Sequence, residues 1–416
     1  MSHLRAFMAP VLAAALSPLL LTAPGTAAPV PTDGSVATTT ARTATATTDA
    51  RTSSTTARKA QSARITVLPK VAQKGKGAKN ADRAKAVGEV KVSPAKEGRK
   101  VQIQISSDSG ASWRNLGTVK KTNANGIVYF VPAGATTGTT WSYRAQVKAF
   151  KGSPAFPTAK VDDRWSMLFQ DQFGGGSLNS SLWQTRGDFY DKGSKRKCSK
   201  ASPKMAKVGS GVLTLQVKKD PARRGDVCKW RSPGGKTKKF NYYLNGHVGT
   251  DHSFSFRYGV AAARVKFQEP QGMHGSFRKN TSGEPEGNRA VEIDTVEFFG
   301  KGYSKGGLAQ FLHYKGRKIG GLQPSANTVL SGTDNWWKKY HVFSVNWTPG
   351  GYSFRIDGKE TYRTTKARSD KQVVAILSLL SSDWELDQMP KSGKGSMKVD
   401  WFRVWQDQSL AARNLQ

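Results

Sequence analysis

The stretch that decides the fold is RAVEIDTVEFFG, residues 289–300, which places three carboxylates in a segment with the composition of a buried β-strand. Its other side chains are mostly β-branched or aromatic, the types that pack well on a pleated sheet. Carboxylates are almost never fully buried without a partner. The presence of Glu292, Asp294 and Glu297 in this strand therefore needs an explanation.

The spacing of the three acids predicts a break in the strand. Successive side chains of a strand point to opposite faces, so Glu292 and Asp294 share one face. Glu297 lies five residues after Glu292 and would face the core if the strand were regular. One extra residue at Thr295-Val296, a β-bulge, would return Glu297 to the face of the other two acids.

Three carboxylates on one face of a sheet repel one another, which raises the pKa of at least one of them. A carboxylate and a protonated carboxylic acid about 5 Å apart form the catalytic pair of a retaining glycosidase. The carboxylate attacks the anomeric carbon, and the acid protonates the leaving oxygen. The spacing alone is equally consistent with a calcium site, because Ca²⁺ prefers oxygen ligands, or with a solvated face.

The rest of the chain divides by composition. Residues 1–28 have a short basic region, an apolar stretch and a run of small residues, which is the pattern of a signal peptide. We therefore expect a secreted, extracellular protein and no membrane-spanning segment. Residues 29–64 are rich in Thr, Ala and Ser and predict a disordered linker.

The remaining residues predict an all-β protein with two folded modules. Residues 65–161 contain alternating runs such as KVQIQIS and a hairpin signal at Asn125-Gly126, which predicts a small immunoglobulin-like β-sandwich. We expect this accessory module to bind a surface or to act as a spacer. Residues 162–408 contain many short strand-like segments without a long amphipathic helix, which predicts one large sandwich or jelly roll. Residues 409–416 are a C-terminal tail.

Charge and cysteine content add two expectations. The formal net charge of +36 favours acidic partners, such as an anionic cell-wall polymer or an acidic glycan, and the sequence carries no nucleic-acid recognition motif. Cys198 and Cys228 are the two cysteines of the chain, and an oxidising compartment would let them form a disulfide. Two free buried thiols are the alternative.

The acid motif and its surroundings carry a family resemblance. EIDTVE, residues 292–297, resembles the E-x-D-x-x-E signature of glycoside hydrolase family 16, which includes laminarinases, agarases and carrageenases. Other segments resemble landmarks of that family in the same order: WSMLFQDQFGGGSLNSSLW, LNGHVGTDHSFSFRYGVAAARVKF, FLHY, HVFSVNWTPGGYSFRIDG and MKVDWFRVWQ. The resemblance covers about residues 165–406 and implies a concanavalin A-like β-jelly-roll sandwich, with a concave sheet that forms a glycan cleft.

The resemblance also implies roles for individual residues. Glu292 resembles the nucleophile, Asp294 the assisting carboxylate and Glu297 the acid/base. His313 resembles a histidine that lines the cleft, and Asp400 resembles a position that can contribute to a structural Ca²⁺ site. No cofactor is required for the chemistry itself.

Departures from the family pattern concern the substrate. A Trp-rich stretch of the family is replaced by GMHGSFRKN, residues 272–280, so His274 and Arg278 are expected to contact the substrate in its place. Trp384 and the pair Trp336-Trp337 are expected to stack on sugar rings, with a core position as the alternative.

The sequence therefore predicts a retaining endo-glycosidase that hydrolyses internal β-linkages of a polysaccharide, with β-1,3-glucan as the preferred substrate. Three alternatives stay open at this point. They are a hydrolase of a sulfated galactan, favoured by the basic charge and Arg278, a transglycosylase that shares the same site, and a glycan-binding or cell-wall-binding protein without activity.

Overall fold

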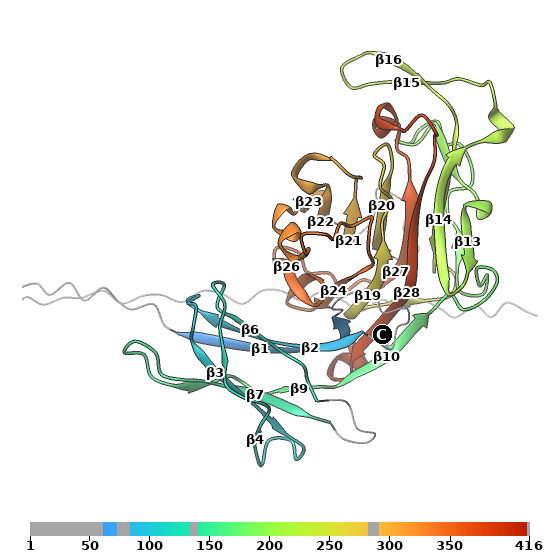
Figure 1. The fold of residues 1–416 in the computed structure, drawn as a ribbon. Helices are drawn as coiled ribbons and strands as arrows, with labels where there is room; N and C mark the ends of the chain where they lie inside the picture. Colours follow the sequence, from blue (N-terminus) through green and yellow to red (C-terminus); the bar gives the residue numbers. More distant parts are fainter. Residues whose placement is uncertain (1–60, 73–83, 134–139, 282–290, 414–416) are drawn as a thin grey trace, which may run out of the picture. The chain divides into compact units, whose positions relative to one another are not determined.

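The computed structural model describes residues 61–72, 84–133, 140–281 and 291–413. The predicted signal peptide and nearly all of the predicted linker lie outside these described residues. Within them the chain is built from β-strands joined by turns and short 3-10 segments, so the predicted all-β fold class is confirmed (Figure 1). No helix in the described part of the chain has the length and apolar character needed to cross a bilayer.

The small N-terminal module consists of two sheets around one apolar core. One sheet contains β1 (Ser62–Ala72), β2 (Lys85–Ser93) and β6 (Ile127–Phe130). The other contains β3 (Lys100–Ser106), β4 (Arg114–Asn115), β5 (Lys120–Lys121), β7 (Ser142–Val147), β8 (Phe156–Pro157) and β9 (Val161–Asp162). Side chains from both sheets share a core that includes Ile103, Val128 and Tyr143.

The Asn125-Gly126 turn differs from the prediction in what it connects. Gly126 has a φ of 71°, the left-handed conformation that glycine adopts without strain, so the turn itself forms. However, β5 before the turn pairs with β3, whereas β6 after it pairs with β2. The turn therefore passes the chain from one sheet to the other instead of closing a hairpin. The more specific immunoglobulin-like topology stays a prediction.

The larger module is a jelly-roll sandwich of two antiparallel sheets, which we call the front sheet and the back sheet. The front sheet has the order β23-β22-β21-β20-β27-β17. Its strands are β17 (Tyr243–Gly249), β20 (His274–Thr281), β21 (Val291–Phe298), β22 (Leu308–Tyr314), β23 (Arg317–Leu322) and β27 (Val373–Leu380). Two short strands extend its edge, β11 (Gln184–Thr185) on β17 and β18 (Ser255–Phe256) on β27.

The back sheet has the order β26-β25-β24-β19-β28, and β28 then pairs with β10 along one half and with β14 along the other. Its strands are β10 (Trp165–Asp171), β14 (Val212–Lys219), β19 (Gly259–Lys266), β24 (His341–Thr348), β25 (Gly351–Ile356), β26 (Lys359–Thr364) and β28 (Gly395–Asp407). Two further strands, β12 (Ser199–Ala201) and β13 (Ala206–Gly209), pair with β17 and β14.

The faces of the two sheets that meet form the main core. This core takes Val291, Ile293 and Val296 from β21, with Phe277 and Leu377 beside them on the front sheet. Because side chains alternate along a strand, the residues between these core positions lie on the outer face of the front sheet. The register of β21 thus decides which of its acids reach that outer face.

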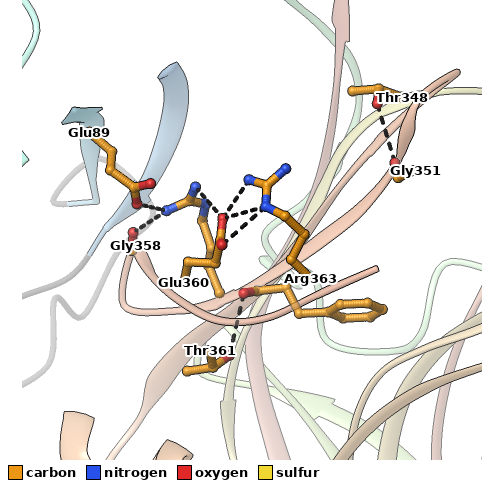
Figure 2. A network of polar contacts seen from close by, with 9 residues as sticks. Glu89, Thr348, Gly351, Gly358, Glu360, Thr361 and Arg363 are labelled. Carbon is orange, nitrogen blue, oxygen red and sulfur yellow. Dashed lines mark hydrogen bonds and ion pairs between the residues drawn. The ribbon is translucent and has the colours of Figure 1, made fainter. Parts of the chain in front are cut away.

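The β1–β2 hairpin belongs to two cores at once. Its first half packs inside the small module, while Leu68, Val71 and Val87 pack against the outer face of the back sheet, where Trp401 and Trp405 are buried. A buried ion pair crosses the same contact, because the Arg355 guanidinium lies 2.6 Å from Glu89 and 3.2 Å from Glu360. Figure 2 shows Glu89 and Glu360 on either side of that guanidinium, with Arg363 next to Glu360.

The predicted disulfide between Cys198 and Cys228 is present. It ties the segment before β12 to the base of a separate two-stranded hairpin, formed by β15 (Cys228–Arg231) and β16 (Thr237–Phe240). Figure 1 shows this hairpin extending beyond the ends of β13 and β14.

Candidate active site

The three acids of β21 lie around a β-bulge at the predicted position. Glu292 pairs with His313 and Asp294 with Phe311 on β22, but the next pair joins Glu297 to Ala309, so Thr295 and Val296 form the irregularity. The pairing with β20 shifts at the same point. Val296 faces the core, and Glu297 therefore returns to the outer face with the other two acids.

Buried polar side chains support the bulge from the core side. The Lys279 side-chain nitrogen of β20 is fully buried and donates a hydrogen bond to the Thr295 hydroxyl, and burial lowers the pKa of this group well below its ordinary value. The Gln310 amide donates to the Thr295 carbonyl over 3.2 Å and accepts from the Thr361 hydroxyl over 2.6 Å. Hydrogen bonds between buried groups are expensive to break, so this chain of contacts fixes the conformation of the bulge.

Glu292 is held by an arginine of the neighbouring strand. Arg278 of β20 donates to the Glu292 carboxylate over 2.9 Å, and the two side chains are 5% and 13% exposed. A guanidinium at this distance stabilises the ionised carboxylate. Arg278 also lies 3.4 Å from the His247 ring nitrogen on β17. Burial and three nearby arginines lower the pKa of His247 well below its ordinary value, so its ring is neutral and accepts this contact.

Asp294 is the acid whose protonation the site changes most. It is fully buried, and burial together with the charges of Glu292 and Glu297 raises its pKa well above the ordinary value of 3.8. Neither of its carboxyl oxygens has a hydrogen-bond partner among the described residues. The predicted repulsion between the acids is therefore present, and it adds to burial in favouring the protonated form of Asp294, the middle acid.

A histidine and a lysine continue the row of side chains that starts at Glu292, across β22 and β23. His313, its neighbour on β22, is exposed, and Lys318 of β23 is the next residue in the same row of the sheet. The Lys318 ammonium lies 4.0 Å from the centre of the Phe311 ring, which borders Asp294. Lys318 was not predicted as a site residue, because an exposed lysine in a short edge strand gives no local signal of its place in the sheet.

Two predicted residues lie at the end of the front sheet. His274 is buried, and its ring nitrogen bonds the Glu385 carboxylate over 2.7 Å, so it anchors the turn that carries Trp384 and does not present its ring to a substrate. Trp384 is 44% exposed and lies 6.0 Å from the Phe299 ring. It remains available to stack on a sugar.

Three other predictions need correction. Trp336 is 1% exposed and packs in the main core, so it cannot stack on a sugar. Trp337 is half-buried against Phe298, whose side chain belongs to the core face of β21, and so lies away from the acids. Asp400 forms a buried ion pair with Arg264 over 2.7 Å, which satisfies its charge without a metal ion.

The calcium alternative for the three acids also loses support. Arg278 already forms an ion pair with Glu292, which leaves less negative charge at this face for a hard cation. Within the described ranges, no group of three or more His, Cys, Asp or Glu side chains is arranged to hold a metal ion.

Comparisons with known proteins find one matching family model and several relatives. The family model described as glycosyl hydrolases family 16 matches residues 194–403. The chain is 20% identical to glucan endo-1,3-beta-glucosidase A1 of Niallia circulans over 292 residues, 62% of this chain and 42% of that protein. It is 33% identical to a beta-glucanase of Acetivibrio thermocellus over 111 residues, 27% of this chain and 30% of that protein. The chain thus spans less than half the length of these curated relatives.

Among solved structures, the laminarinase catalytic domain of Thermotoga maritima MSB8 aligns with 59% of this chain and 99% of its own, at 18% identity and a TM-score of 0.47. The endo-β-1,3-glucanase of Pyrococcus furiosus aligns with 58% of this chain and 94% of its own, at 19% identity and a TM-score of 0.46.

Proposed function

The chain belongs to glycoside hydrolase family 16, and from this we propose that it is a secreted, retaining endo-glycosidase that hydrolyses internal β-linkages of a β-1,3-glucan. The observation that carries the proposal is the bulge, because it returns Glu297 to the face that holds Glu292. Two carboxyl groups on one face, with a protonated acid between them, suit a double-displacement mechanism.

In this mechanism Glu292 is the nucleophile. Arg278 keeps its carboxylate ionised and fixes its position, so that an oxygen can attack the anomeric carbon and form a covalent glycosyl-enzyme. Glu297 donates a proton to the leaving glycosidic oxygen and then removes a proton from the water that releases the sugar. Asp294 enters as a neutral acid, and its proton can stabilise the Glu292 carboxylate when that group leaves the sugar.

The choice of substrate rests on the names of the curated relatives. A glucan endo-1,3-beta-glucosidase and a beta-glucanase favour a β-glucan over a galactan. Secretion is supported by the disulfide, because such bonds persist in oxidising compartments. The polysaccharide also accounts for exposed Trp384, since an aromatic face can stack on a sugar ring.

A second candidate is the hydrolysis of an anionic galactan. Lys318 lies in the same row of the sheet as Glu292, beyond His313, where its ammonium could neutralise a sulfate or carboxylate of the sugar next to the cleaved bond. A neutral β-glucan makes no use of this cation. If this candidate is right, Lys318→Gln should raise KM for the anionic polymer and leave kcat on laminarin unchanged.

One experiment separates the candidates. The protein is incubated with laminarin, mixed-linkage glucan, agarose, carrageenan and an anionic cell-wall polymer, and chain lengths are followed by chromatography. Rapid shortening of laminarin supports the main proposal, and preferred cleavage of carrageenan supports the second. An added acceptor sugar that yields longer products identifies a transglycosylase. Inactivity on every polymer, with binding retained, contradicts an enzymatic function.

A further inference from the structure

The outer face of the back sheet carries a basic hollow at the end that the β1–β2 hairpin does not cover. The hollow has a volume of about 420 Å³ and lies over the ends of β14, β19 and β28. We call it the lysine hollow. Its lining includes the lysines Lys218, Lys266, Lys394 and Lys398, together with Trp337, Phe267 and Pro270.

The positively charged lysines of the hollow repel one another. Lys266 and Lys398 are directly opposite each other across β19 and β28, and like charges in such a pair destabilise a sheet. Burial and the charge of Lys398 lower the pKa of Lys266. Glu269 is the one acid in the described lining, and Lys301 binds it over 3.0 Å. The arrangement is therefore suited to an anion that neutralises the lysines from outside.

The apolar side chains in the lining indicate which kind of anion would bind in the lysine hollow. Trp337 is stacked on Phe298 with an angle of 16° between the rings, so its position is fixed by the core. A fixed indole ring beside cations is typical of sites that stack on a sugar ring and bind its charged substituents. Isolated phosphate or chloride would make no use of Trp337 or Pro270.

A second hollow lies on the other side of the turn at residues 389–396. It has a volume of about 390 Å³ and is lined by Lys219, Lys239 and Lys391, beside Asp226, Phe240 and Tyr243. The two hollows flank the same turn, because residues 389–391 line one and residues 392–396 line the other. Two lysine-lined hollows beside one turn suit a polymer better than a single sugar.

We propose that the lysine hollow is a second binding site, on the sheet opposite to the three acids, for an acidic polysaccharide that carries carboxylate or sulfate groups. The site would hold the protein on an acidic matrix while the front sheet acts on another chain. The Trp337 ring binds the sugar, and the opposed pair Lys266 and Lys398 binds its charge.

The test measures binding of the full chain to immobilised dextran sulfate, polygalacturonate and neutral dextran over a range of salt concentrations. Lys266→Gln with Lys398→Gln should weaken binding to at least one acidic polymer by about tenfold at low salt and make it less sensitive to salt. Trp337→Ala should weaken binding to the same polymer. The control is Lys100→Gln with Lys121→Gln, which removes an equally opposed, exposed lysine pair from the small module and should change nothing.

Laminarin hydrolysis by the lysine variants should match that of the unmodified protein, because none of these lysines lies on the front sheet with the acids. Thermal unfolding should occur at the same or a slightly higher temperature, because each double substitution removes an opposed like-charge pair. Equal losses in the control pair would overturn the proposal, since binding would then follow net charge alone. Binding to neither acidic polymer would also overturn it. So would equally tight binding of polyphosphate that Trp337→Ala leaves unchanged, because the ligand would then not be a sugar. The binding measurement does not depend on catalysis, so it tests the lysine hollow even if the protein does not cleave laminarin.

Discussion

Arg355→Met should unfold the protein at a much lower denaturant concentration, because the substitution leaves Glu89 as a buried charge without its partner. Both side chains are 1% exposed, and the guanidinium also bonds Glu360 over 3.2 Å and the Gly358 carbonyl over 3.2 Å. Removing one member of a buried ion pair costs about 3–5 kcal/mol. For a module of this size each kcal/mol lowers Tm by roughly 2–4 °C, so the expected loss is roughly 6–20 °C.

A double substitution separates the charge effect from simple loss of packing. Glu89→Leu with Arg355→Met removes both buried charges, and we expect it to recover most of the loss, to within about 1–2 kcal/mol of the unmodified protein. Glu360 keeps Arg363 as a partner in this variant. Lys301→Met is the matched control, because its ion pair with Glu269 is 60% and 55% exposed and should contribute no more than about 0.5 kcal/mol.

Urea unfolding followed by tryptophan fluorescence gives these free energies, since Trp336, Trp347 and Trp401 are buried and report on the main core and the back sheet. The reasoning is refuted if Arg355→Met unfolds at the same urea concentration as Lys301→Met. It is also refuted if the double variant is no more stable than Arg355→Met, because the stranded charge would then not be the cause.

Three further predictions concern the site and its surroundings. Thr295→Val removes the hydroxyl that accepts a hydrogen bond from Lys279 and so loosens the bulge that positions Glu297. We expect kcat to fall tenfold or more with little change in KM, whereas Thr295→Ser should retain activity, and steady-state kinetics measure both values. The pKa of Asp294 is higher in the folded protein than its ordinary value of 3.8, so the folded state becomes less stable relative to the unfolded state as pH rises above about 4. Asp294→Asn removes this effect and should raise the free energy of unfolding by about 1–2 kcal/mol near pH 7, and urea unfolding should show no gain below about pH 4. The same variant should lose most of its activity. Replacing Cys198 and Cys228 by Ser should lower the free energy of unfolding by about 3–4 kcal/mol, since the bond closes a loop with a sequence separation of 30, and an unchanged urea midpoint would contradict this.

Features could be predicted from the sequence where a rule about neighbouring residues allowed a single arrangement. The alternation of strand side chains allowed one place for the extra residue between Asp294 and Glu297, and the bulge lies there. The disulfide was predictable because the chain has two cysteines and a signal-like segment at its start. In both cases the evidence lay within a short stretch or a simple count.

The predictions were wrong where the role of a residue depends on a contact with another residue that is far away in the sequence. Trp336 and His274 have residue types that suit a sugar site, but contacts with the main core and with Glu385 place them elsewhere. The pair of Glu89 and Arg355 joins residues separated by 266 positions, so no local pattern could indicate it. The raised pKa of Asp294 depends on burial by neighbouring strands, which spacing along β21 does not reveal.

The most direct test of the central claim is to trap the glycosyl-enzyme. The protein is incubated with an activated 2-deoxy-2-fluoro glycoside of a laminarin oligosaccharide, digested, and the labelled peptide is sequenced by mass spectrometry. We predict one covalent sugar on Glu292, no label in Glu292→Gln, and faster label formation than turnover. A label on Glu297 or Asp294, or full laminarin hydrolysis by Glu292→Gln, would contradict the proposed mechanism.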